Sequence, residues 1–175
     1  MLTQFRLAVF ALALLAGLWA GVAGAQWSGT RIARLEPGYG GVCEECDLSG
    51  RILAGARMSR SVFNRADFSN AVLTRADATR AQFEGADFTG ADLTRVKLVE
   101  ALCEDAVFVE AVLTRANAQR ANFAGADFTR ARLDEADFSG ADLRQTRGLT
   151  QAQLNQACGD RETRLPRGLR LPVCD

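Results

Sequence analysis

The chain has 175 residues, enough for one domain with short terminal pieces. Its 21 lysines and arginines balance its 21 aspartates and glutamates, so no overall field favours nucleic acid or a polycation. The absence of histidine excludes Ser-His and Cys-His catalysis and imidazole metal ligands.

The N-terminal segment, residues 1–25, has the form of a secretory signal. One basic residue, Arg6, precedes an apolar run from Leu7 to about Leu18, and small residues follow up to Ala25. The pattern predicts cleavage after Ala25 and a periplasmic or secreted protein, with no membrane span afterwards. An uncleaved anchor is the alternative, because no charge lies between Arg6 and Arg31, but the apolar run is short for a span.

Residues 26–45 are predicted to form an N-terminal cap, because a solenoid needs its open end covered. The apolar side chains available for this cap are Trp27, Ile32, Leu35 and Tyr39. Cys43 and Cys46 form a C-x-x-C motif, which redox proteins and zinc sites also use. The two intervening glutamates raise a thiol pKa, so a structural disulfide, or a pair tying the cap to the first coil, is favoured.

Residues 46–145 repeat every five residues, as in ADFTGADLTR from Ala86 to Arg95. An apolar residue, here called the centre, recurs at every fifth position from Leu48 to Leu143. From Ala66 to Ala141 an alanine lies two positions before each centre, except at Val96. A step of five scatters side chains around an α-helix, and it alternates the faces of a strand. A chain that turns a corner every five residues directs all the centres to one axis, which indicates a solenoid.

These residues resemble the pentapeptide-repeat family, whose consensus is close to A-(D/N)-(L/F)-x-x. The resemblance implies an all-β solenoid, a right-handed quadrilateral β-helix with four pentapeptides in each coil, and hence about five coils here. Centres twenty residues apart should then stack, and like residues do recur at that spacing. One column reads Leu48, Phe68, Phe88, Phe108 and Phe128, and the next reads Leu53, Leu73, Leu93, Leu113 and Leu133.

Residues 146–175 are predicted to form a C-terminal cap of a short helix and an extended tail. Thr150 and Gln153 provide a capping box, Leu149 and Leu154 a hydrophobic staple, and Gly159 a stop after Cys158. A disulfide between Cys158 and Cys174 would stabilise the fold by about 3 kcal/mol in the chain-entropy model.

Two departures from the repeat consensus are candidate partner-binding surfaces. One is a pair of arginine rows, which suggest an anionic partner unless nearby acids such as Asp77 and Asp92 neutralise them. The rows are Arg75, Arg95 and Arg115, and Arg60, Arg80 and Arg120, the second interrupted by Glu100. The other departure replaces polar residues with apolar ones at outward positions, which is typical of an interface. Its residues are Val99, Leu102, Val107, Val109 and Val112.

Stacked aspartates also suggest calcium, but hydrogen bonding within each turn explains them better. The residues concerned are Asp47, Asp67, Asp87 and Asp127. Cys103 lies at a centre and is predicted to be a buried thiol. We expect no cofactor, no metal and no catalytic site, since no nucleophile–base pair or phosphate loop is visible.

The sequence therefore predicts a non-enzymatic scaffold of the bacterial envelope that binds a protein or an anionic polymer, with a homodimer as a further possibility. The alternative comes from the family resemblance, because some cytoplasmic members mimic DNA and bind DNA gyrase through a strongly acidic surface. The zero net charge and the predicted export count against that alternative.

Overall fold

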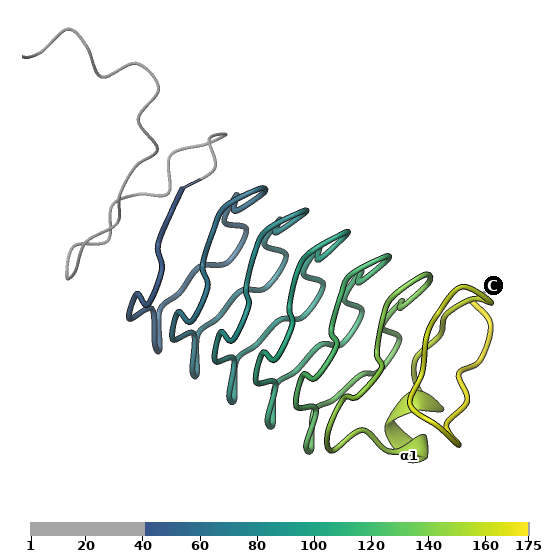
Figure 1. Ribbon diagram of the computed structural model, residues 1–175. Helices are drawn as coiled ribbons and strands as arrows, with labels where there is room; N and C mark the ends of the chain where they lie inside the picture. The colour runs from purple at the N-terminus through teal and green to yellow at the C-terminus, as the bar shows by residue number, and fades with distance from the viewer. Residues whose placement is uncertain (1–40, 175) are drawn as a thin grey trace, which may run out of the picture.

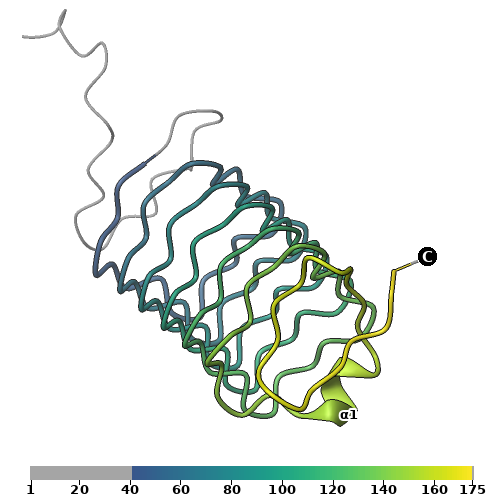
Figure 2. The same ribbon diagram turned by 45° about the vertical axis from the view of Figure 1, so that its right-hand side comes forward.

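The computed structural model describes residues 41–174. Most of the N-terminal calls, the signal segment and the cap up to residue 40, lie outside these residues. The described chain winds into a stack of rectangular coils, and the C-terminal end carries the single helix of this part (Figures 1 and 2). Within the same residues no helix is long and apolar enough to cross a membrane.

Four columns of parallel β-bridges, each joining residues twenty apart, define the walls of the solenoid. We number the walls faces 1 to 4 in chain order, by the bridges at Asp47, Ile52, Arg57 and Val62. Face 1 therefore lies opposite face 3. The twenty-residue stacking that the repeat predicts is confirmed.

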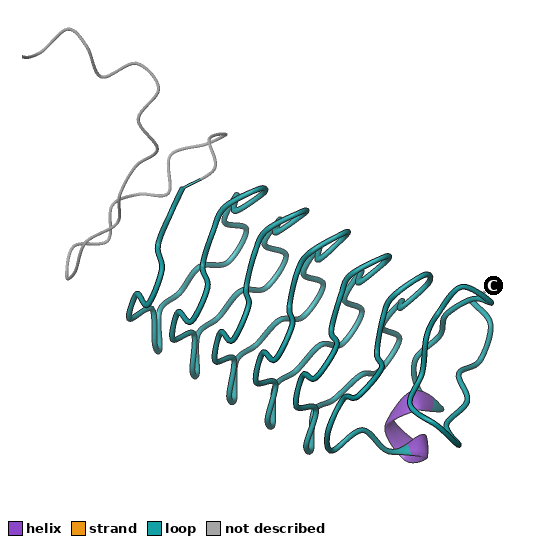
Figure 3. Cartoon of the chain, in the orientation of Figure 1, coloured by secondary structure: helices purple, strands orange, loops and turns teal. Residues whose placement is uncertain are grey.

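The bridges are isolated, and the described residues contain no longer strand (Figure 3). Each five-residue unit spends its remaining positions on a corner, so only the residue before the centre pairs with both neighbouring coils. Asp67, for example, pairs with the preceding coil through its own N–H and carbonyl, which bond to Cys46 and Leu48. It pairs with the following coil through its neighbours Ala66 and Phe68, which both bond to Asp87. The expected all-β solenoid is thus built from single bridges, because a wall one residue wide cannot extend a ladder.

Each corner is a tight turn whose third residue has a positive φ. The N–H of Ala66 donates to the carbonyl of Phe63, and Arg65 between them has φ 58°. A hydrogen bond over three residues with positive φ at the third position is the geometry of a type II turn. Glycine fills six of the repeat corners, but arginine fills eight at φ 57–60°.

The centres and the alanines fill the interior. Phe68, Phe88 and Phe108 are at most 1% exposed and stack with ring centroids 4.9 and 5.0 Å apart. The next aromatic column crosses this stack edge to face, as where Phe83 meets Phe88 at 5.2 Å. Cys103 is fully buried among these residues, and burial raises the pKa of its thiol. Stacking of like on like therefore gives a close-packed, dry core.

Helix α1, Gln151–Leu154, begins where the sequence predicts. Thr150 accepts from the backbone of Gln153, whose side chain accepts from the backbone of Thr150, so the capping box is present. The helix ends early, at the C-cap Asn155, and the predicted stop at Gly159 is wrong. Residues 157 and 158 resume the solenoid instead: Ala157 is buried, and Cys158 bridges to Asp137 on face 3.

The tail then closes the end of the solenoid. Arg164 bridges to Asp142 and extends face 4, while Val173 bridges to Gly159. Leu165 and Leu171 pack against the core. A side chain at Gly159 would collide with Leu171, since an added Cβ would meet that leucine's side chain. Gly159 is therefore needed for close packing of the tail.

Candidate partner-binding surface

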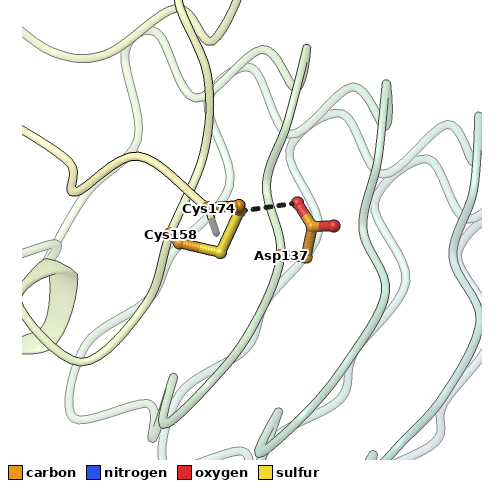
Figure 4. Close-up of side chains that lie close together, drawn as sticks. All are labelled: Asp137, Cys158 and Cys174. Atoms are coloured by element: carbon orange, nitrogen blue, oxygen red, sulfur yellow. Dashed lines mark hydrogen bonds between the residues drawn. A yellow bond between two sulfur atoms is a disulfide. The ribbon is translucent and has the colours of Figure 1, made fainter.

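Both predicted disulfides are present, joining Cys43 to Cys46 and Cys158 to Cys174. Figure 4 shows the second beside Asp137, whose Oδ1 lies 3.3 Å from Cys174 Sγ. These three residues have metal-ligand chemistry, but disulfide sulfurs are not thiolates and cannot act as ligands. Burial opposes ionisation of Asp137, yet hydrogen bonds from Ser139 and Gln119 lower its pKa overall. The disulfide and its contact with Asp137 therefore hold the C-terminal tail against the last coils of the solenoid.

The aspartates on the bridge positions bind their own turns. Asp87 Oδ1 accepts from the N–H of Thr89 at 2.8 Å and from its hydroxyl at 2.6 Å. Asp127 holds Thr129 in the same way, at 2.9 and 2.6 Å, and these two hydrogen bonds lower the pKa of Asp127. The interpretation of these aspartates as turn residues, not calcium ligands, agrees with this geometry.

The five apolar outward residues do not form one patch. Leu102, Val107 and Val112 stand in the bridge columns of faces 4, 1 and 2, so they are spread around one coil. Leu102 is 44% exposed, whereas Val107 and Val112 are half-buried between bridge neighbours. Val109 follows on face 1, and Val99 lies on face 3. The run from Val99 to Val112 covers fourteen residues of a twenty-residue coil, which is why neighbours in sequence lie on different faces.

The arginine rows, in contrast, lie where the sequence places them. Arg75, Arg95 and Arg115 occupy successive corners between faces 2 and 3, and each donates its N–H to the coil that follows. The row of Arg60, Arg80 and Arg120 occupies the corners between faces 3 and 4. The two rows therefore form the two edges of one wall, face 3.

The centre of this wall adds two cations that the sequence analysis did not single out. Arg57 and Lys97 are bridge residues of face 3, and both are exposed. We call residues 54–60, 74–80, 94–100 and 114–120 the basic face. It carries eight cations and two acids. The cations are Arg57, Arg60, Arg75, Arg80, Arg95, Lys97, Arg115 and Arg120, and the acids are Asp77 and Glu100. Arg57 and Lys97 are forty residues apart, which is two coils. The twenty-residue period of the coil could therefore have placed both cations on one wall from the sequence.

Three of these cations are neutralised, but not by the acids that we expected. Glu100 lies between Arg80, at 2.7 Å, and Arg120, at 4.0 Å, and the hydrogen bond from Arg80 and its charge lower the pKa of Glu100. Arg115 forms a two-bond pair with Glu135, at 2.7 and 3.0 Å.

Asp77 and Asp92, the two acids that we expected to neutralise the arginine rows, instead accept hydrogen bonds from the backbone N–H groups of Thr79 and Thr94. The other five cations of the basic face form no salt bridge with the described residues. They are Arg57, Arg60, Arg75, Arg95 and Lys97, and all five are exposed. The pairing therefore leaves a wall with excess positive charge, although Lys97 interacts electrostatically with Asp77 and Arg95 with Glu135.

The repeats, the fold and the corner geometry define a pentapeptide-repeat solenoid. The family model described as pentapeptide repeats, with eight copies, matches residues 43–77, 66–102 and 106–145. The chain belongs to this family, whose members are generally non-catalytic and fold as right-handed quadrilateral β-helices.

Solved structures with this fold include a pentapeptide-repeat protein from the thylakoid lumen of Arabidopsis thaliana. It is 28% identical over 62% of this chain and 80% of that chain, with a TM-score of 0.57. A pentapeptide-repeat protein from Nostoc is 22% identical, covering 73% and 84%, with a TM-score of 0.41. QnrB1, a plasmid-mediated fluoroquinolone resistance protein, is 16% identical, covering 66% and 68%, with a TM-score of 0.36. No curated protein matches the sequence.

Proposed function

We propose that this protein is a non-enzymatic scaffold of the bacterial envelope that binds an anionic protein or polymer through its basic face. The observation that carries the proposal is the set of five exposed cations on face 3 and its corners that form no salt bridge within residues 41–174. Coils stack at about 4.8 Å, so these charges repel one another until an anion neutralises them. Arginine suits such a surface because its guanidinium binds carboxylates and phosphates with two hydrogen bonds.

The rigid backbone supports this role. Each corner arginine is held between coils by its backbone N–H, as where Arg95 donates to Thr114 at 2.9 Å. The row therefore forms a ladder of fixed spacing, and an extended anionic chain can contact several rungs at once. Multiple weak contacts on one rigid surface give a useful affinity without a deep pocket.

The proposed location is the periplasm or the extracellular space, with about five coils between terminal caps. Two disulfides favour an oxidising compartment, and the lumenal source of the 28% identical structure points weakly the same way. The signal-like pattern of residues 1–25 supports export.

The alternative function is DNA mimicry directed at gyrase, and the charge distribution gives it one supporting observation. Although the net charge of the chain is zero, acidic residues gather on one side of the solenoid. The argument against mimicry assumed that acidic and basic residues are evenly distributed over the surface. Predicted export still disfavours an encounter with gyrase. A supercoiling assay with purified gyrase decides this point, and inhibition or protection at stoichiometric protein would favour the alternative.

The test of the main proposal uses two defined probes, polyglutamate and dextran sulfate, titrated against the purified protein. The Arg75→Glu/Arg95→Glu variant changes two cations of the basic face that form no salt bridge with the described residues. The matched control, Arg167→Glu/Arg170→Glu, makes the same charge change at two exposed arginines of the C-terminal tail. We expect at least a tenfold loss of affinity in the first variant only, and weaker binding as salt rises. Equal affinity in both variants would refute a role for the basic face.

A further inference from the structure

The side of the solenoid opposite the basic face is as strongly acidic as the basic face is positive. It comprises residues 44–50, 64–70, 84–90, 104–110 and 124–130, which form the first five rungs of face 1 and its two bordering corners. The last rung of face 1, residues 144–150, carries Arg144 and Arg147 and is not part of it. This acidic side carries ten acids and two cations. The acids are Glu44, Glu45, Asp47, Asp67, Glu84, Asp87, Glu104, Asp105, Glu110 and Asp127, and the cations are Arg65 and Arg130. Zero net charge therefore conceals two opposite, oppositely charged walls.

The two cations of the acidic side are already paired within it. Arg65 contacts Glu45 at 3.0 Å, and Arg130 contacts Glu110 at 2.6 Å. The other eight acids form no salt bridge with the described residues. Each wall thus carries charged groups that form no salt bridge with the described residues and that a second molecule of opposite charge can contact.

We propose that copies of this protein associate side by side, with the acidic side of one copy against the basic face of the next. The partner is a second copy because the two walls match coil by coil. In each coil the acids of one wall and the cations of the other are separated by about half a turn of the solenoid. The successive matches are Glu44 with Arg57 and Arg60, Asp67 with Arg75 and Arg80, Glu84 with Arg95 and Lys97, and Glu104 with Arg115 and Arg120.

The matching fixes the relative orientation of the copies. A second copy shifted sideways, parallel to the first, brings like-numbered coils together and so aligns the first four acidic rungs with the four basic rungs. Both surfaces share one coil spacing, so the register holds along the whole wall. Only the last rung breaks the pattern, because Asp134, Glu135 and Asp137 follow the basic face with acids. In this register it lies against residues 124–130, which carry Asp127, so the favourable contact is confined to the first four coils.

The contact joins different surfaces of the two copies, so it does not close on itself. Such heterologous contacts build open arrays in place of dimers of fixed size. Surface charges are screened beyond about 8 Å at physiological ionic strength, so the association should be strong at low salt and weak at high salt. The array goes beyond the proposed function, and its ends and any unoccupied basic face remain free for an anionic partner.

The experiment is sedimentation velocity of the purified protein over a concentration series at about 20 mM and about 500 mM salt. We expect the weight-average mass at low salt to be at least twice that at high salt and to rise with concentration without a plateau at the dimer. A single monomeric species at low salt throughout the series would overturn the proposal.

Two charge-reversal variants test the surfaces. Arg75→Glu/Arg95→Glu lowers the net charge of the basic face from +6 to +2, and Glu84→Lys/Glu104→Lys lowers that of the acidic side from −8 to −4. Each variant alone should stay monomeric at low salt, and an equal mixture should associate again, because one complementary pair of walls is restored. The tail control Arg167→Glu/Arg170→Glu should associate like the unmodified protein. Association that persists in either variant would place the contact elsewhere, for instance at the solenoid ends, and would refute the proposal.

The same variants separate this inference from the proposed function. Glu84→Lys/Glu104→Lys retains the basic face, so it should still bind polyglutamate although it no longer self-associates. Probe binding without self-association of the unmodified protein would leave the proposed function intact and the array wrong. Self-association without probe binding would give the reverse result.

Discussion

Replacing Arg95 with glycine should raise stability while it weakens anion binding. Arg95 sits at a corner with φ 58°, where a residue with a Cβ costs about 1–2 kcal/mol. Glycine removes that strain but loses about 0.5–1 kcal/mol through the greater freedom of the unfolded chain. The net gain is about 0.5–1 kcal/mol, which raises Tm by roughly 1–4 °C for a chain of this size.

The reciprocal change lies in the same corner row. Gly55 has φ 67°, and an added Cβ there would meet no atom within 4 Å, so an arginine fits without a clash. Gly55→Arg should lower stability by about 0.5–1 kcal/mol and strengthen anion binding, since it lengthens the row. Thermal unfolding by circular dichroism and titration with polyglutamate measure the two quantities. A Tm of Arg95→Gly below that of the unmodified protein would show that the arginine stem stabilises the corner, and would refute the reasoning.

Other predictions concern the core, the turns and the cap. Phe88→Ala should lower the free energy of unfolding by about 3–5 kcal/mol in urea, because it opens the ring stack, and a loss under 1 kcal/mol would contradict dry packing. The hydrogen bonds that Asp127 accepts stabilise the fold fully above its ordinary pKa of 3.8, and this stabilisation is lost as pH falls through the lowered pKa of the folded state. The urea midpoint of Asp127→Asn should therefore fall less between pH 7 and pH about 3 than that of the unmodified protein. Without reductant, unfolding should expose one cysteine that alkylating reagents can label, Cys103, and a second labelled cysteine in the unmodified protein would disprove a disulfide. In the Cys158→Ala/Cys174→Ala variant the free energy of unfolding should be about 3 kcal/mol lower.

The sequence determines the coil stack because one physical requirement is repeated many times. Every fifth residue from Leu48 to Leu143 must reach the axis, and only a corner every five residues allows this. The register then follows from arithmetic, so the arginine rows could be placed in space from the sequence alone. The isolated bridges could not be, because a pattern of centres does not say how many residues of each wall pair with their neighbours.

Long side chains were harder to predict. Arg80, Arg115 and Arg120 reach along their own corner columns to Glu100 and Glu135, not across the wall to Asp77. The aspartates were unavailable because the turn N–H and hydroxyl groups already hold them. The apolar residues from Val99 to Val112 were expected to form one patch because they are close in sequence. They lie on different faces because the chain turns a corner every five residues.

The cap shows the limit of local signals. The capping box at Thr150 was correct because it depends only on residues three apart. The prediction that the helix ends at Gly159 was wrong. The helix ends earlier because Ala157 packs in the core and Cys158 forms a β-bridge to the preceding coil. Tertiary packing of the end coil outweighs the helical signals of the segment.

The central claim is that the basic face binds an anionic partner, and photo-crosslinking in living cells tests it most directly. A photoreactive residue placed at position 97, in the middle of face 3, is compared with one at position 107, on the opposite face 1. The account predicts adducts with an anionic protein or polymer from position 97 that disappear when Arg75 and Arg95 are changed to glutamate. Such adducts from position 107 alone, or adducts from position 97 that survive the arginine changes, would contradict it.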